Sequence, residues 1–288
     1  MMEKDAKLLS KLSLMISENE FHALLHAQGK NQTDYYHYHD YYEILFYLGE
    51  REVRYEKDNW STVIRKGDVV FCRMFENHIV DCAENEGHLR FCVGIEPHLL
   101  GGFSKKDASL YLLFSNQNPN YPVMHLDMVR MQKYLWMIEE FQQLGNSPGE
   151  QVIASSIIHR MLGSLYCDLK PENHQGTASL QHMDMVGSII HFIEQNLDQD
   201  LSLDRVAQHY NYSPAYISRI FKEITGSSLV RYIIEKRIGC AKQMLYDDME
   251  IMRVAEKVGY RNYSNFYKAF RKAVGCGPEE FRKKAQEQ

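Results

Sequence analysis

The apolar positions in the first part of the chain occur in short runs that suit β-strands. Between residues 21 and 124, runs of β-branched and aromatic residues are broken by polar and glycine-containing turn signals. The clearest runs span residues 43–48, 53–55, 69–72 and 89–95. This pattern predicts an all-β sandwich or barrel over residues 1–126.

The apolar spacing becomes helical after residue 126. From 127 to 144, and again from 151 to 169, apolar residues recur every three or four positions, which predicts two amphipathic helices in the segment 127–170. They carry more apolar surface than a small barrel edge needs, so we expect a homodimer to form through them. Core packing within the monomer is the alternative. The stretch 171–181, which begins polar and holds a proline and a glycine, is the expected linker.

An internal repeat organises the remaining part, residues 182–288. The segment 206–212 recurs at 254–260, an offset of 48 residues, and the similarity continues at an offset of 49. Asn211 and Gly259 occupy the same turn position, where these two residue types tolerate a positive φ at the least steric cost. Each copy therefore predicts a helix, a tight turn and a second helix, over 203–210 and 213–225 in the first copy and over 251–258 and 262–274 in the second.

The connection between the two helix-turn-helix copies is also expected to be helical. Gly226 and Gly275 are the stop signals of the two second helices. Residues 229–246 then form a connecting helix, which at 1.5 Å per residue spans roughly 27 Å. Second helices held apart in this way suit adjacent major-groove segments on one face of B-DNA, which lie about 34 Å apart.

The outward side of each second helix is the candidate DNA-binding surface. Inward-facing apolar residues such as Ile217 and Phe266 leave the other helical phases to solvent, and a cation recurs at the same phase in both copies. Long cations and hydroxyl groups suit contacts with base edges and phosphates. The alternative is that these are solvated faces of an ordinary helical bundle. The candidate residues are Ala215, Ser218, Arg219, Lys222, Tyr263, Ser264, Tyr267, Lys268 and Arg271.

Charge and cysteine content indicate which part of the chain meets an anionic partner and in which compartment the protein is expected. The formal net charge is −5, but residues 1–179 carry −7 whereas residues from 217 onward carry +6, so the anionic partner should meet only the C-terminal part. The six cysteines show no C-x-x-C spacing, which favours reduced structural thiols. The sequence offers no export signal and no membrane-spanning run, so we expect a cytoplasmic protein without a membrane partner.

A series of motifs extends from about residue 180 to 284. They include Leu203-x-x-Val206-Ala207, Tyr216-Ile217-Ser218-Arg219-x-Phe221-Lys222, Arg237-x-x-x-Ala241-x-x-x-Leu245, Val258-Gly259-Tyr260 and Phe270-Arg271-x-x-x-Gly275-x-x-Pro278. Through these motifs the chain resembles the DNA-binding domain of AraC/XylS transcription regulators. This resemblance implies base contacts by Ala215, Ser218 and Arg219 in the first copy and by Tyr263, Ser264, Tyr267 and Lys268 in the second. Ala215 departs from the larger side chain common at its position, which implies that the first copy contacts fewer base pairs.

A histidine-rich segment marks the candidate effector site in the β-rich part. His37-x-His39-x-x-x-Glu43, followed by Gly67-Asp68 and His78, resembles the two motifs of the cupin barrel. Cupin enzymes use such residues to bind a divalent metal. The closer resemblance is to AraC-type sensor domains, which implies that no metal or other cofactor is bound. We expect a small polar effector instead, for which a sugar is the favoured class, although half-buried sheet residues would show the same alternation. The candidate effector-binding residues are His37, His39, Glu43, Tyr47 and His78.

Together these features predict a multi-domain α+β regulator rather than an enzyme. A cupin-like β-barrel with two following helices precedes an all-α domain in which a helix joins two helix-turn-helix motifs. We expect an activator of carbohydrate or other small-molecule utilisation genes that binds double-stranded DNA as a homodimer, with RNA polymerase as a further candidate partner. The alternatives are a metal-dependent cupin enzyme fused to a DNA-binding domain and a nucleic-acid-binding scaffold that responds to no ligand.

Overall fold

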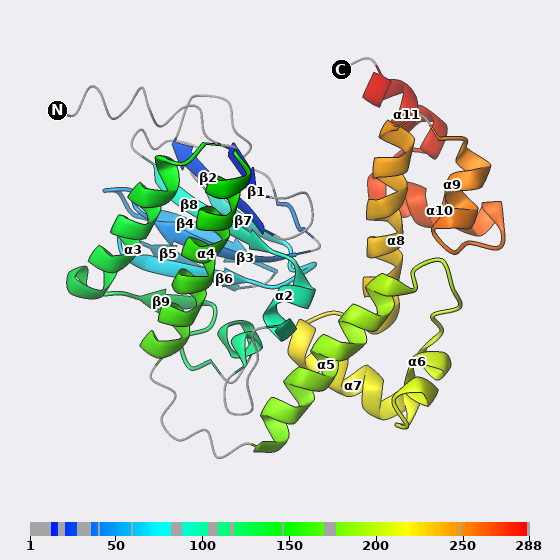
Figure 1. Cartoon of the computed structure of the whole chain (residues 1–288), viewed down its shortest axis with the longest axis horizontal. Coiled ribbons are helices and arrows are strands. Elements are labelled where there is room, and N and C mark those ends of the chain that lie inside the picture. The colour runs from blue at the N-terminus through cyan, green and yellow to red at the C-terminus, as the bar shows by residue number, and fades with distance from the viewer. Residues whose placement is uncertain are drawn as a thin grey trace. The chain divides into compact units, whose positions relative to one another are not determined.

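The described part of the chain forms two compact units, and the main boundary between them falls after Gly187 (Figure 1). The computed structural model describes residues 13–16, 21–27, 36–39, 41–58, 60–81, 88–102, 109–115, 118–145, 147–169, 177–247 and 249–286. Of the helices in these ranges, none has the length and apolar character needed to cross a bilayer.

The first unit contains two antiparallel sheets. One has six strands in the order β1-β2-β8-β3-β6-β9, and the other has three in the order β5-β4-β7. Strand β3 is central, because it pairs with both β6 and β8. The strands are β1 (Ser13–Ile16), β2 (Phe21–Ala27), β3 (Tyr42–Tyr47), β4 (Val53–Lys57), β5 (Trp60–Ile64), β6 (Asp68–Cys72), β7 (His78–Asp81), β8 (Leu89–Ile95) and β9 (Val123–His125).

Strand β3 is buried on both faces, which explains its nearly continuous apolar sequence. Its inward residues Leu45 and Tyr47 join a core with residues of β4, β5, β6, β7 and β8. On the opposite face, the ring of Phe46 lies 5.2 Å from that of Tyr134 in α3. Glu43 shares the inward phase of Leu45 and Tyr47, because side chains alternate along a strand. A carboxylate is therefore placed toward the core. The remaining elements of this unit are α2 (Pro97–Gly102), the 3-10 helix η1 (Leu110–Phe114), α3 (Met128–Gln142) and α4 (Pro148–Asp168).

Helices α3 and α4 lie side by side over the larger sheet (Figure 1). Asp127 caps α3 by accepting a hydrogen bond from the backbone N–H of Arg130, and Ser147 caps α4 in a reciprocal arrangement with Glu150. The inner face of α3 is buried, with the Phe141 ring 5.5 Å from that of Phe91 in β8. Both helices were predicted from the sequence to within three residues at each end.

The second unit is entirely helical in its described residues. Its two helix-turn-helix motifs are α6 with α7 and α9 with α10, and α8 connects them (Figure 1). The predicted fold class, with a β-rich unit and two helices ahead of a double helix-turn-helix unit, is confirmed. The helices are α5 (Thr177–Gln195), within which the boundary between the units falls, α6 (Leu203–His209), α7 (Pro214–Thr225), α8 (Leu229–Tyr246), α9 (Ile251–Lys257), α10 (Tyr263–Val274) and α11 (Pro278–Gln286).

The turns of both motifs have the backbone conformation that the sequence predicts. Asn211 has a φ of 58° and Gly259 a φ of 82°, while Gly226 and Gly275 have φ values of 77° and 85°. The second helices begin at caps, since Ser213 Oγ accepts from the N–H of Tyr216 and Asn262 Oδ1 accepts from that of Ser264. The two motifs thus share one local design.

The predicted linker over residues 171–181 does not hold for its last five residues. Residues 171–176 lie outside the described ranges, but 177–181 form the start of α5. The stretch 177–181 contains neither glycine nor proline, so nothing in its local chemistry stops a helix that continues into the buried positions Val186 and Ile190.

Candidate functional sites

Helix α7 presents a polar, cationic face. Its apolar side is buried, with Ile217, Ile220 and Phe221 each at most 1% exposed. On the other side Ala215, Arg219 and Lys222 are exposed and Ser218 is half-buried. The Arg219 guanidinium lies 3.5 Å from Glu223 and 5.5 Å from the ring centre of Tyr216, both on the same helix. Because an exposed ion pair of this kind is worth little, Arg219 can exchange it for a phosphate or a base.

Helix α10 repeats this arrangement in the second motif. Phe266 and Phe270 are fully buried, while Ser264, Tyr267, Lys268 and Arg271 are exposed. Tyr263 differs, because its ring is half-buried and packs against the core of this motif. The structure therefore gives solvent access to the predicted surface of α10, with Tyr263 shared between that surface and the core.

The two candidate surfaces lie toward opposite ends of α8 (Figure 1). This helix has 18 residues, and at 1.5 Å per residue it spans roughly 27 Å. Its side toward the second motif is buried, through Ile238, Ala241 and Leu245. A rigid spacer of this length supports simultaneous insertion of two helices into successive major grooves.

Arg237 ties the two motifs together, a role that the sequence did not indicate. From α8, its Nε donates to the carbonyl of Leu197 at 3.0 Å and a terminal nitrogen donates to the carbonyl of Gln199 at 2.6 Å, both ahead of the first motif. Its guanidinium also lies 5.4 Å from the ring centre of Tyr260, in the turn of the second motif. The partners are 38 and 40 residues away in sequence, so no local pattern could reveal the link.

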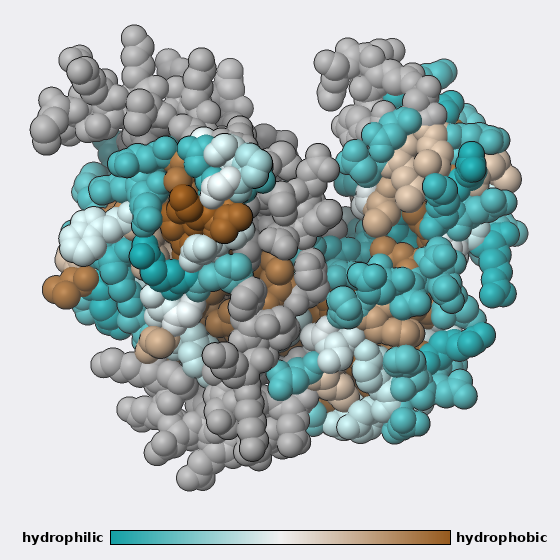
Figure 2. Space-filling view, in the orientation of Figure 1, coloured by the Kyte–Doolittle hydropathy of each residue, from teal (hydrophilic) through white to brown (hydrophobic). Residues whose placement is uncertain are grey.

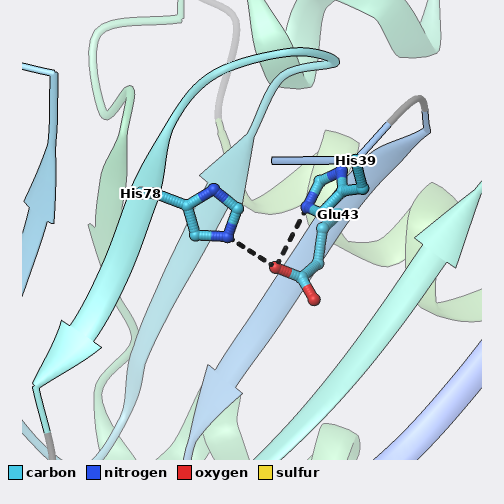
Figure 3. A group of neighbouring side chains, drawn as sticks. All are labelled: His39, Glu43 and His78. Carbon is cyan, nitrogen blue, oxygen red and sulfur yellow. Dashed lines mark ion pairs between the residues drawn. The ribbon is translucent and has the colours of Figure 1, made fainter. Parts of the chain in front are cut away.

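In the first unit, His39, Glu43 and His78 form a compact buried group (Figure 3). The Nε2 atoms of both histidines point at one oxygen of Glu43, from 3.5 Å for His39 and 3.4 Å for His78. His39 is 9% and His78 1% exposed. A hydrogen-bonded backbone bridge between His37 and His78 fixes the position of the segment that carries His39. Two sheets supply the group, since β3 holds Glu43 and β7 holds His78.

The surroundings of Glu43 and His78 favour the charged form of each side chain. Burial alone raises the pKa of Glu43, but the two neighbouring histidines bring it well below its ordinary value. Burial lowers the pKa of His78, while the nearby Cys72 and Glu43 raise it to about 11. Cys72 lies directly across from Glu43 in the β3–β6 pairing, and burial raises the pKa of its thiol. A carboxylate and imidazole nitrogens thus meet in a site screened from solvent.

The other two predicted effector residues take different positions. His37 is exposed, and its ring centre lies 4.4 Å from that of His78, so it borders the group. Tyr47 is fully buried in the core between the sheets, and its hydroxyl donates to the carbonyl of Arg51 at 2.5 Å. Four residues along a strand separate Tyr47 from Glu43 by about 13 Å. The structure therefore brings His39, Glu43 and His78 together, with His37 at the edge and Tyr47 apart.

A polar network that the sequence did not indicate supports His78 from behind. The Nδ1 of His78 donates to the backbone carbonyl of Glu76 at 2.9 Å. The side chain of Glu76 in turn accepts from Lys57 at 2.6 Å and from the Tyr121 hydroxyl at 2.7 Å. Because these partners fix Glu76, they also fix the orientation of the His78 ring.

Helices α3 and α4 also carry exposed apolar side chains. Figure 2 shows apolar residues at the surface over these two helices. On α3, Val129 is 86% and Trp136 64% exposed, and their spacing of seven residues places them on one side of the helix. Val152 and Ile153 are exposed near the start of α4. The inner faces of these helices are core, as the packing alternative from the sequence expects, and dimerisation through their outer faces stays a prediction.

No disulfide joins the cysteines in the described ranges. Cys72 and Cys92 are buried, Cys240 and Cys276 are half-buried, and Cys167 is exposed. Cys82 lies outside the described residues.

Comparison with known proteins places the repeat in a family. A helix-turn-helix domain model matches residues 206–284. The transcriptional activator AarP of Providencia stuartii is 32% identical over 99 residues, which covers 34% of this chain and 73% of AarP. The melibiose operon regulatory protein of Escherichia coli is 30% identical over 161 residues, and the match spans only 53% of that protein.

Among solved structures, this chain is similar to ToxT from Vibrio cholerae with an unsaturated fatty acid bound. The match covers 94% of this chain and 96% of the ToxT chain. The TM-score is 0.55 at 10% sequence identity. The likeness therefore concerns the fold, in which a β-rich part precedes a helix-turn-helix part.

Proposed function

The chain belongs to the AraC family of transcription regulators, and on that premise we propose that it binds specific operator DNA through α7 and α10 and changes transcription in response to an effector. The observation that carries the proposal is the pair of exposed cationic faces, Arg219 with Lys222 and Lys268 with Arg271, at matched phases of the two second helices. Phosphate contacts by such residues position a protein on DNA, and base contacts specify the sequence. The proposed contacts are Ala215, Ser218, Arg219, Lys222, Tyr263, Ser264, Tyr267, Lys268 and Arg271.

Selection from a random duplex pool, followed by titration of the enriched duplex, tests this function. We expect Arg219→Ala and Lys268→Ala each to weaken specific binding by about 1–3 kcal/mol, because each removes a contact with a base or a phosphate. Folding stability should change little, since both side chains are exposed. Lys257→Ala, which removes an exposed cation from α9, is the matched control. Unchanged affinity in both recognition-helix variants would rule out these faces as the binding surface.

The effector is proposed to act at the histidine–glutamate group of the first unit. His39, Glu43 and His78, with His37 at the edge, offer donors and acceptors to a small polar ligand. The melibiose operon regulator is named for a sugar system and the ToxT structure holds a fatty acid, so these two proteins point to different ligand classes. A sugar is the class that the sequence alone favours, from the aromatic residues near the histidine-rich segment.

A homodimer through α3 and α4 is the proposed assembly, supported by the exposed Val129 and Trp136. It would place four helix-turn-helix motifs on DNA, where an activator could also contact RNA polymerase. Trp136→Glu should convert the dimer to a monomer in sedimentation analysis, because a charge at an apolar interface is not compensated. Met252→Glu, at a side chain 51% exposed on α9, is the control and should leave the mass unchanged. A wild-type monomer at micromolar concentration would contradict the dimer.

A further inference from the structure

The group formed by His39, Glu43 and His78 has the dimensions of an ion site. The three ligand atoms, one from each side chain, all lie within 4.8 Å of one another. They adjoin a core packed with Leu45, Val70 and other side chains of both sheets. A sugar needs a cavity of some hundreds of Å³, whereas an ion needs only the space between its ligands.

Hydrogen bonds to the backbone decide which nitrogen of each histidine is available. The Nδ1 of His39 lies 2.7 Å from the carbonyl oxygen of Tyr41, and that of His78 lies 2.9 Å from the carbonyl oxygen of Glu76. A carbonyl oxygen only accepts, so both Nδ1 atoms carry hydrogen. In the neutral imidazole each Nε2 then holds a lone pair directed at the same carboxylate oxygen. This is the outer-shell arrangement by which proteins orient histidines toward metals.

With both imidazoles neutral, the arrangement lacks a positive charge at its centre. In that state two lone pairs and a carboxylate face one another and repel, so either protons on the imidazoles or a cation must occupy the centre, because buried polar atoms of this kind are normally satisfied. The Nε2 of His39 is buried and makes no hydrogen bond among the described residues. A cation between the three atoms would satisfy all of them at once.

We propose that His39, Glu43 and His78 bind a divalent transition-metal ion, and that this ion is an effector of the regulator. Two imidazoles and one carboxylate suit Zn²⁺, Fe²⁺, Mn²⁺ or Ni²⁺ better than Ca²⁺ or Mg²⁺, which favour all-oxygen ligands. The proposal departs from the expectation of a metal-free site drawn from the sequence. Its regulatory half rests on the proposed DNA-binding function.

The position of the ligands gives the ion a structural effect. Glu43 belongs to the six-stranded sheet, His78 belongs to the three-stranded sheet, and His39 lies in the segment preceding β3. Binding therefore links three segments across two sheets. A ligand that binds only this linked state stabilises it in proportion to the free ligand concentration.

Titration of the full-length, chelator-treated protein with ZnCl₂, MnCl₂ and NiCl₂ tests the site. We expect one ion per chain by calorimetry and a loss of affinity of about a hundredfold or more in Glu43→Gln, because a first ligand contributes at least as much as its outer-shell support. His39→Gln should lose affinity similarly. His125→Ala is the control, since that histidine pairs with Asp68 elsewhere in the same unit and is largely exposed. Circular dichroism confirms that each variant is folded.

A Co²⁺-loaded sample provides a second measurement that does not depend on stability. Visible absorption of the bound Co²⁺ that disappears in Glu43→Gln would support the site, and a thiolate charge-transfer band would add Cys72 as a ligand. If no ion binds, or if Glu43→Gln binds the ion as well as the parent protein does, the metal site is overturned. Protonation of the two histidines would then explain why their Nε2 atoms face the carboxylate of Glu43.

Titration of the enriched duplex with and without the metal separates the two claims. We expect the ion to change DNA affinity by about tenfold or more, within the usual range of allosteric coupling, and Glu43→Gln to remove this change. If the ion binds without altering DNA affinity, the proposal that it is an effector is overturned, whereas the proposal of a metal site stands. Absence of DNA binding in every state would refute the proposed function, while calorimetry would still decide the metal site.

Discussion

Phe270→Ala is expected to unfold the second helix-turn-helix motif. The side chain is fully buried, and its ring lies 5.6 Å from those of both Phe266 in α10 and Phe281 in α11. Truncating a buried aromatic residue typically costs about 3–5 kcal/mol, through lost burial and the cavity left behind. That is a large share of the roughly 5–15 kcal/mol by which a domain is stable. Urea denaturation followed by circular dichroism measures the loss.

Tyr267→Ala is the matched control for this prediction. It removes an aromatic side chain from the same helix, but from the outer face, where Tyr267 is 36% exposed. We expect well under half the destabilisation of Phe270→Ala. If the two variants were equally stable, the assignment of inner and outer faces of α10 would be wrong.

Gly259→Ala should have the second large effect, on both stability and DNA binding. At a φ of 82°, a side chain already costs about 1–2 kcal/mol. Its Cβ would also lie 2.4 Å from the carbonyl oxygen of Leu197 and 2.6 Å from a guanidinium nitrogen of Arg237. Relieving this overlap adds about 1–3 kcal/mol. The shift moves the turn of the second motif away from the loop ahead of the first, so affinity for a two-site duplex should fall more than affinity for a single site.

Gly275→Ala separates these two contributions. Gly275 has a φ of 85°, nearly that of Gly259, but an added Cβ would meet no described atom within 4 Å. The difference in unfolding free energy between the two variants therefore measures the close approach alone. Equal losses in both variants would show that the contact made through Arg237 does not hold the motifs together.

Arg237 and the histidine–glutamate group show two ways in which distant segments are joined in this protein. The guanidinium of Arg237 donates hydrogen bonds to two carbonyls of the loop ahead of the first motif. It also lies beside the ring of Tyr260 in the turn of the second motif. The histidine–glutamate group places the carboxylate of Glu43 between a ring from β7 and a ring from the segment that precedes β3. In both cases, polar or charged side chains find their hydrogen-bonding and ionic partners in segments that are distant along the chain.

Local chemistry along the chain was enough to predict the helical unit closely. The bounds of α8 agree with the predicted range 229–246, and Asn211 and Gly259 have the positive φ values expected of the turns. Capping residues, glycine stops and apolar spacing act within a few residues, so they can be recognised without the fold. The same holds for strand β8, whose ends match the predicted range 89–95.

Local sequence patterns were less informative about the start of α5 and about the role of Tyr47. The start of α5 at Thr177 was missed, because a proline and a glycine precede it and suggested a longer linker. Tyr47 lies on the same face of β3 as Glu43, yet its hydroxyl donates to the carbonyl of Arg51 instead of joining the histidine–glutamate group. Periodicity assigns a residue to a face, but it does not determine which neighbours that face meets.

The sequence by itself determined the family, the two repeated motifs and the residues on their outer faces, because those features arise from interactions between near neighbours in the chain. Only the tertiary structure decided that the two histidines His39 and His78 meet one oxygen of Glu43. It also decided that the Tyr47 hydroxyl is used elsewhere and that Arg237 reaches back 40 residues to Leu197. The distances that matter there depend on sheet pairing and helix packing, and contacts between segments far apart along the chain have no periodic trace in the sequence.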